Sequence, residues 1–260
     1  MNKLPIGLLA RHAYLDVLAN QEGLLRVGGP WLLLSWALLL LAHSGVPLLN
    51  LAADLSVTVG AAAIAVTWHR HILEDEPLTA KFAPVDARVM RYFVLTVLLA
   101  FVVGVPPLLM LVLTGGAEIL VGGGDGDTPT GGGLGMLLVP VTMVACLYAA
   151  QRLQMLLPAA AIRDTGMTAA RSWALTQGNG WRLLAGFALV TLPLAVLMIA
   201  ITLFLGWASD ATGSIVLAAL ADLVAVGNAW LQAPIIASFL AYAYLFLQKP
   251  STELARVTAQ

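Results

Sequence analysis

Long, almost uncharged runs of apolar residues dominate the chain and predict membrane-spanning helices. Crossing about 30 Å of hydrocarbon takes roughly 20 consecutive, mostly apolar residues in a helix. Six runs of this length are bounded by charges or turn signals, and they cover about Val27–Leu49, Ala52–Leu73, Tyr92–Leu113, Leu134–Ile162, Leu183–Trp207 and Ile215–Leu247. The pattern therefore predicts an all-α, polytopic membrane protein with six transmembrane helices.

The sixth run is longer than a bilayer requires. A straight helix of about 33 residues would measure near 50 Å, which exceeds the hydrocarbon thickness. We therefore expect its first part, including Asp222, to lie at the membrane surface, or the helix to bend near Gly227 or Pro234.

Composition agrees with this prediction and excludes several classes of protein. Apolar residues make up 60% of the chain, charged residues 10%, and mean hydropathy is +0.90. A soluble domain carries about 25% charged residues. A soluble enzyme, a nucleic-acid-binding protein and a disordered protein are therefore excluded, and we expect no nucleic acid among the partners.

The positions of the basic residues predict the orientation. Six spans place both termini on one side, and all 13 Lys and Arg residues then fall on that side. They are Lys3, Arg11, Arg26, Arg70, Lys81, Arg88, Arg91, Arg152, Arg163, Arg171, Arg182, Lys249 and Arg256. Because basic loops stay in the cytoplasm, we predict a multi-pass protein of the inner (plasma) membrane with both termini cytoplasmic.

The polar segments divide the chain further. We expect an N-terminal interfacial helix in residues 1–26, a six-span domain in 27–248 and a cytoplasmic tail in 249–260. A glycine-rich stretch, 115–135, reads as a flexible outer linker, although a single imperfect glycine–aspartate match leaves ion binding as an alternative. The segment before each odd-numbered span is expected to form a short helix along the inner headgroups; in the third, Thr168 is the predicted N-cap and Gly178 follows the C-cap.

Two motifs, AVTWHRHILEDEP (65–77) and ARSWALTQGNGWRLL (170–184), resemble a group of bacterial inner-membrane proteins without an agreed activity. That group is similar to the membrane domain attached to some glycerophosphodiester phosphodiesterases. The resemblance implies a six-helix membrane domain. In those enzymes a separate barrel-type domain performs hydrolysis, and this chain has no room for one.

We find no signature of catalysis. The chain lacks HExxH, GxSxG and paired-aspartate motifs. His69, His71 and Glu74 to Glu76 could bind a cation, but a solvated loop whose charges pair with Arg70 is the simpler interpretation. We predict no intrinsic enzyme activity, no metal and no cofactor.

The remaining candidates are the basic and aromatic residues of the inner face. Tryptophan is favoured at headgroup depth, and arginine reaches lipid phosphates. We therefore predict a non-catalytic protein for lipid handling, membrane organisation or partner binding, whose partners are membrane lipids or another membrane or peripheral complex. The candidate residues are Arg70, Arg91, Arg152, Arg171, Trp173, Asn179, Trp181 and Arg182.

A small transporter or channel is the alternative. Proline residues could open unwound, polar backbone inside the membrane, although an ordinary kink is the commoner outcome. Asn228 and Gln232 could bond between helices or line such a path. The residues of this alternative path are Pro106, Pro107, Pro193, Asn228, Gln232 and Pro234.

Overall fold

The structure is a computed structural model that describes residues 3–79, 82–113 and 132–248. Lys81, most of the predicted glycine-rich linker (114–131) and the predicted tail (249–260) lie outside the described residues. The last residues assigned to the linker belong instead to a helix, which begins at Gly132.

Six spans are long and apolar enough to cross a membrane, as predicted. The described residues form helices and connections, with no strand among them. The spans are α2 (Gln21–Ala42), α3 (Pro47–Leu73), α4 (Ala87–Leu113), the pair α6 (Gly132–Leu153) and α7 (Leu156–Ala161), α9 (Gly180–Thr212) and α10 (Ile215–Gln248). The all-α, six-span prediction is confirmed.

The short helices match the prediction only in part. α1 (Ile6–Ala19) precedes the first span, but Gln21–Arg26, expected in the same interfacial segment, already belongs to α2. α8 (Ala169–Leu175) has the predicted cap, because the Thr168 side chain accepts a hydrogen bond from the Arg171 backbone N–H, and Gly178 has φ +76°. The described residues between α3 and α4 form no helix, so the prediction of a short helix before the third span is wrong.

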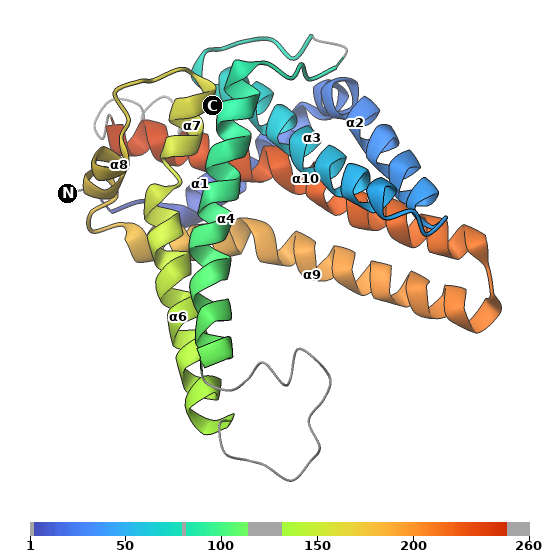
Figure 1. The fold of residues 1–260 in the computed structure, drawn as a ribbon. Coiled ribbons are helices and arrows are strands. Elements are labelled where there is room, and N and C mark those ends of the chain that lie inside the picture. Colours follow the sequence, from blue (N-terminus) through green and yellow to red (C-terminus); the bar gives the residue numbers. More distant parts are fainter. Residues whose placement is uncertain (1–2, 80–81, 114–131, 249–260) are drawn as a thin grey trace.

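The spans pair into three hairpins, α2–α3, α4–α6 and α9–α10, which meet at one end of the molecule (Figure 1). α3 and α9 both pack along α10, whereas the α4–α6 hairpin diverges from α9 and contacts the rest mainly near the shared end. This end of the molecule collects the start of α1, the short helices α7 and α8, and the connection between α3 and α4. We call it the basic face, because these elements and the adjoining helix ends carry Arg70, Arg91, Arg163 and Arg171. The molecule is therefore V-shaped, with its point at the basic face.

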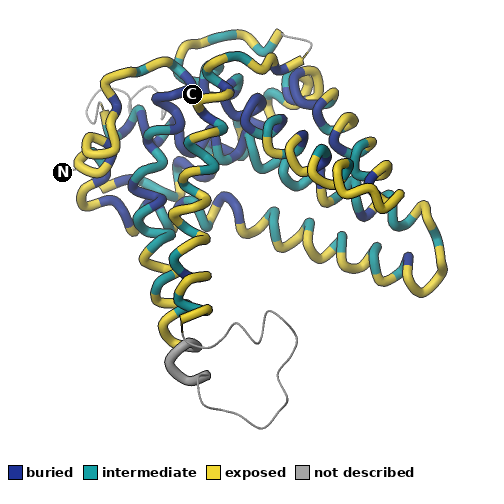
Figure 2. The backbone as a smooth tube through the Cα atoms, viewed as in Figure 1, coloured by how far each residue is buried: buried dark blue, intermediate teal, exposed yellow. Residues whose placement is uncertain are grey.

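The buried core lies near the basic face, where α1, α3, α7 and α10 meet (Figure 2). Trp68, Ile64 and Phe239 are almost fully buried there. Far along α4 and α9 the side chains are mostly exposed, for example Phe101 at 60% and Leu203 at 68%. Those apolar surfaces face the hydrocarbon of a membrane rather than other helices.

The tract from Ile215 to Gln248 is one continuous α-helix of 34 residues that contains Pro234. The expected position of its first part at the membrane surface, and the alternative of a bend near Gly227 or Pro234, stay predictions. Its partner α9 is equally long, with 33 residues. A helix of about 50 Å would fit the roughly 40–45 Å of core plus headgroups when tilted by about 30°.

Candidate functional site

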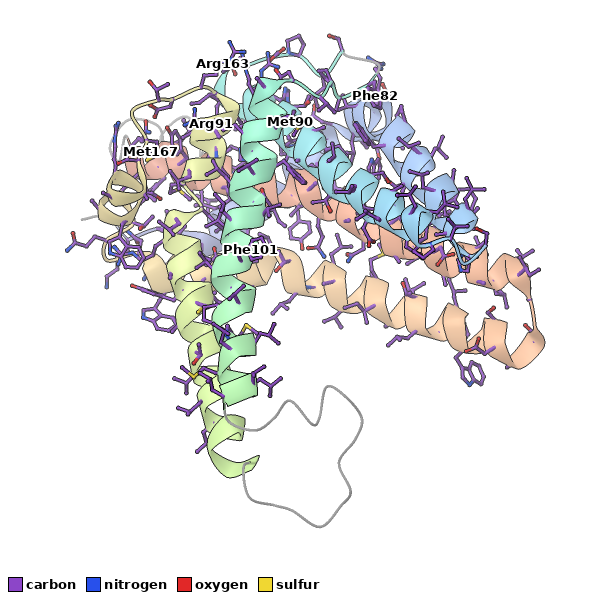
Figure 3. All side chains as sticks on the ribbon, viewed as in Figure 1. Phe82, Met90, Arg91, Phe101, Arg163 and Met167 are labelled. Atoms are coloured by element: carbon purple, nitrogen blue, oxygen red, sulfur yellow. The ribbon has the colours of Figure 1, made fainter. Side chains whose placement is uncertain are left out.

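The predicted inner-face residues lie on elements that gather at the basic face, and labelled Arg91 and Arg163 both lie near this end (Figure 3). They differ in what surrounds them. Some are engaged inside the fold, and others are free to meet an external ligand.

Arg152 is an internal residue. Only 9% of it is exposed, and its guanidinium lies 3.9 Å from the centre of the Trp173 ring. It donates to Thr176 Oγ1 at 3.2 Å and to the Trp173 carbonyl, while Ser172 Oγ donates to the Arg152 carbonyl. These contacts attach α8 to the end of α6, so Arg152 stabilises the basic face instead of presenting a free charge.

Asn179 and Arg182 hold the start of the chain. Asn179 Oδ1 accepts from the Leu4 N–H at 2.9 Å, and Arg182 Nη1 donates to the Leu4 carbonyl at 2.9 Å. Leu4 is fully buried and Asn179 is 2% exposed. The structure therefore brings these two predicted residues together, but around the protein's own backbone.

Arg70 takes part in an ionic network between α3 and α4. Its guanidinium contacts Glu74 at 3.3 Å and also pairs with Glu76, and Glu74 lies 3.6 Å from Arg88. Two arginines thus face two glutamates. The sequence interpretation of a loop with charges paired to Arg70 agrees with this geometry.

Arg91, Arg171, Trp173 and Trp181 remain at the surface. Trp173 is 40% exposed and Trp181 62%. Arg171 is exposed but its side chain donates to the Gly166 carbonyl at 3.1 Å, whereas the Arg91 side chain has no hydrogen-bond or ion-pair partner within the described part of the chain. Of the predicted arginines, Arg91 is therefore the freest to bind a ligand.

Sequence reasoning missed three arginines of the same kind. Arg11, Arg26 and Arg163 are exposed, and within residues 3–79, 82–113 and 132–248 their side chains have neither a hydrogen-bond nor an ion-pair partner. Near Arg91 and Arg163, Phe82 and Met90 are 42% and 46% exposed at the same end of the molecule (Figure 3). For Arg11 and Arg163, the signal that could have found them is the lack of an acidic residue three or four positions away, whereas Arg26 follows Glu22 by four positions and carries no such signal.

Asp164 connects the segment after α7 to the end of α10. Its Oδ2 accepts a hydrogen bond of 2.6 Å from the Tyr244 hydroxyl, and its Oδ1 accepts from the Gly166 N–H at 2.9 Å. The Tyr244 bond, helped by those of Gly166 and Met167 and by the Arg171 charge, holds the pKa of Asp164 below its ordinary value, although desolvation opposes the shift. Asp164 is thus ionised at neutral pH and contributes to the basic face as an acceptor.

A second polar cluster, which sequence reasoning also missed, holds α1 against the other helices. Asp16 Oδ2 accepts hydrogen bonds of 2.9 Å from both Trp68 Nε1 and Ser238 Oγ. Two residues earlier on α1, the Tyr14 hydroxyl donates to the Val190 carbonyl at 2.7 Å, and burial raises the pKa of Tyr14. This carbonyl lies three residues before Pro193, in the turn where a missing N–H weakens α9.

The prolines of the alternative transport path lie inside continuous helices. α4, α9 and α10 continue through Pro106, Pro107, Pro193 and Pro234, so the unwound backbone that this alternative requires is not seen in these described helices. Gln232 Nε2 donates to Asn228 Oδ1 at 2.8 Å along α10, so this amide pair is bonded within one helix rather than between helices.

No group of three or more His, Cys, Asp or Glu side chains within the described residues could hold a metal ion. In the predicted histidine-containing segment, His69 is fully buried, with Nε2 3.5 Å from the Tyr92 hydroxyl. His71 Nδ1 lies 2.8 Å from the Glu76 carbonyl. The two rings therefore have separate partners.

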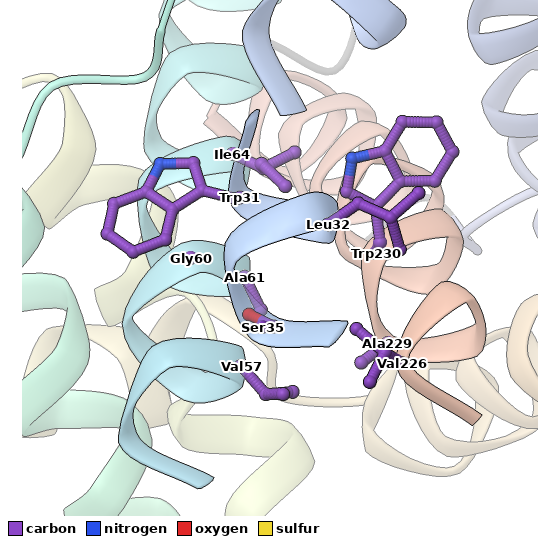
Figure 4. A pocket seen from close by; sticks show the side chains of 10 residues that line it. All are labelled: Trp31, Leu32, Ser35, Val57, Gly60, Ala61, Ile64, Val226, Ala229 and Trp230. Carbon is purple, nitrogen blue, oxygen red and sulfur yellow. The ribbon is translucent and has the colours of Figure 1, made fainter. Parts of the chain in front are cut away.

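A small pocket lies between α2, α3 and α10 (Figure 4). Trp31 and Trp230 stand on either side of it, and the rest of the lining is mostly aliphatic. Its volume is about 210 Å³ when the open mouth is counted. Neither Asn228 nor Gln232 lines it, so the pocket does not belong to the predicted transport path.

No family model, no curated protein and no solved structure matches the chain. Nothing in these comparisons links it to the membrane domain of glycerophosphodiester phosphodiesterases. The resemblance carried by the two motifs therefore stays a prediction.

Proposed function

We propose that this protein is a non-catalytic protein of the bacterial inner membrane that handles lipids by binding anionic headgroups at its basic face. The observation that supports this most directly is the presence of exposed arginines without partners, Arg91 and Arg163, near exposed Phe82 and Met90. Phosphate oxygens would satisfy the guanidinium donors, and the apolar side chains would enter the headgroup boundary.

The arginines fall into two groups, those bonded inside the fold and those without a partner among the described residues, and this difference supports the same proposal. Arg70, Arg152 and Arg182 are engaged in ion pairs or hydrogen bonds that hold elements together. If the arginines of this face served only to stabilise the fold, few of their guanidinium groups would lack a hydrogen-bond acceptor. A basic residue near an anionic leaflet contributes roughly 1 kcal/mol, so the free arginines make binding additive rather than dependent on one contact.

The test uses the purified full chain in nanodiscs with mixed lipids and native mass spectrometry of the retained lipids. We expect the double variant Arg91→Gln/Arg163→Gln to retain phosphatidylglycerol about thirtyfold less, while phosphatidylcholine is unaffected, because about 2 kcal/mol of attraction is removed. Arg182 is left intact because it holds Leu4.

Asp210→Asn is the matched control, because it changes one exposed charge on α9 away from the basic face. It should leave lipid retention unchanged. Equal retention of anionic lipid by the arginine variant and the wild type would refute the proposal. Loss of a co-purifying acidic protein, with lipids unchanged, would instead identify the basic face as a partner-binding surface.

The geometry favours this function over transport. The proline-containing helices are continuous, and the Asn228–Gln232 pair is satisfied within α10. A transport path would need polar groups that face an opening at mid-membrane depth. We therefore propose lipid handling alone.

A further inference from the structure

The pocket between Trp31 and Trp230 has a definite direction relative to the basic face. Trp31 Nε1 donates to the Ala83 carbonyl at 3.1 Å, and the Trp31 ring stacks on Phe82 with centroids 4.9 Å apart. Ala83 and Phe82 both belong to the connection between α3 and α4 at the basic face. Because α3 runs towards that face and α10 ends there, Ile64 and Trp230 lie at the same level, and Val57 and Val226 lie deeper.

The polar atoms of the lining are already engaged or covered. Ser35 Oγ accepts from Ser56 Oγ at 3.0 Å, and Trp31 Nε1 is bonded to Ala83. Trp230 Nε1 has no partner, but it is buried against α2, where a Cβ added to Gly28 would lie 2.1 Å away. An occupant therefore meets hydrocarbon, and a polar or charged ligand would find no donor or acceptor to replace its water.

We propose that this pocket binds one acyl chain of a phospholipid of the leaflet at the basic face, with the ester end near Trp31 and Trp230 and the chain directed towards Val57 and Val226. A concave apolar surface buries more of a chain than the convex side of a single helix, so the bound chain exchanges more slowly than its neighbours. Amphipathic rings are favoured where the ester groups begin, and the bond from Trp31 Nε1 to the Ala83 carbonyl attaches one of the two indoles to the connection at the basic face.

The glycines beneath the two indoles shape the pocket. A Cβ at Gly60 would lie 2.9 Å from the Trp31 ring, and a Cβ at Gly28 would collide with Trp230. Each indole can therefore pack directly against a helix backbone and form a wall. Ala61 and Ala229, which also line the pocket, leave the space between the walls open.

The test is photo-crosslinking of the full chain in nanodiscs with trace phosphatidylcholine that carries a diazirine in its acyl chain, followed by peptide mapping. We expect crosslinks to concentrate on 57–64 and 226–230 relative to the equally apolar, exposed positions of α4 and α9. Diazirines near the ester should label the Ile64 and Trp230 level, and diazirines near the chain end should label Val57 and Val226.

Ala61→Leu and Ala229→Leu fill the pocket, and Ala200→Leu, at an exposed position on α9, is the matched control. We expect pocket crosslinking to fall about tenfold in the first two variants, equivalent to about 1.4 kcal/mol of lost binding, and to stay unchanged in the control. Wild-type crosslinks spread evenly over the lipid-facing helices would overturn the proposal, whether or not the variants fold.

The neutral phosphatidylcholine headgroup separates this inference from the proposed function. If headgroup binding at the basic face fails its own test, pocket labelling by a neutral lipid still stands. If pocket labelling fails while anionic lipids are retained, only the acyl-chain site is refuted.

Discussion

Glycine decides where the helices of this protein come closest. A Cβ at Gly28 would lie 2.1 Å from Trp230 Nε1, and one at Gly186 would lie 2.4 Å from the Phe239 ring. A Cβ added at Gly29 or at Gly206 would have no neighbouring atom within 4 Å. Glycines in the same helices therefore differ in role, because only some of them face a large ring across an interface.

Replacement of Gly28 by Ala should destabilise the protein by about 1–3 kcal/mol, because the Trp230 ring must move away from its packing position against α2. Gly29→Ala is the neighbouring control and should be neutral or slightly stabilising, because alanine is the better helix former. Denaturation in detergent micelles, followed by circular dichroism, measures both. Equal stability of the two variants would contradict this account of the α2–α10 contact.

Asp164 gives the basic face a pH dependence of defined sign. The Tyr244 hydrogen bond holds the pKa of the folded-state carboxyl below 3.8, so its contribution to stability is complete above that pH and disappears as pH falls through the lower folded value. The unfolding temperature of the wild type should therefore fall below pH 4. Tyr244→Phe should lose stability at neutral pH and show a smaller fall on acidification; an unchanged profile would contradict the role of this bond.

Among the elements, α1 is attached to the spans by polar bonds as well as by packing. Its buried side chains, Leu9, Ala10, Ala13 and Val17, face the bundle, and Asp16 connects it to α3 and α10. Asn20 precedes α2, and Asn179 precedes α9, with similar backbone angles (φ −110° and −117°). The first and last hairpins are thus entered in the same way, although only Asn179 also binds the chain start.

Asp16→Ala should therefore loosen α1 specifically. The loss of two hydrogen bonds to a carboxylate should lower stability by about 1.5–3 kcal/mol, and Trp68 Nε1 and Ser238 Oγ would keep only their bond to each other. Hydrogen exchange should accelerate in α1 more than in α9. Asp54→Ala, which removes an exposed carboxylate from α3, is the control; uniform acceleration in both variants would argue against a local role.

At the scale of the whole molecule, the hairpins converge at the basic face and separate beyond it (Figure 1). α4 and α9 keep large apolar side chains exposed on their diverging parts, including Phe101, Val196 and Leu203. Helix contacts inside membranes favour small residues, so these surfaces are suited to lipid rather than to a further helix. In a membrane, the V shape would leave room for bilayer lipid between two parts of the same chain.

The orientation in the membrane can be tested by cysteine labelling in a Cys146→Ser background. Arg91→Cys and Arg163→Cys should react with an impermeant maleimide only after the cells are permeabilised, because basic segments remain cytoplasmic. Ser44→Cys and Asp210→Cys, at exposed positions near the opposite helix ends, should react in intact cells. Labelling of Arg91→Cys and Ser44→Cys from the same side would refute the topology.

The sequence by itself determined the six spans, the Thr168 cap and the Gly178 turn, because segment hydropathy and capping chemistry are local properties. It did not determine that the 34-residue α10 packs along the similarly long α9, since helix pairing depends on contacts between residues far apart in the chain. Only the tertiary structure decided which arginines are free. Arg152 and Arg163 look alike in sequence, yet one is buried under Trp173 and the other is exposed, because burial follows from contacts between residues far apart in the chain.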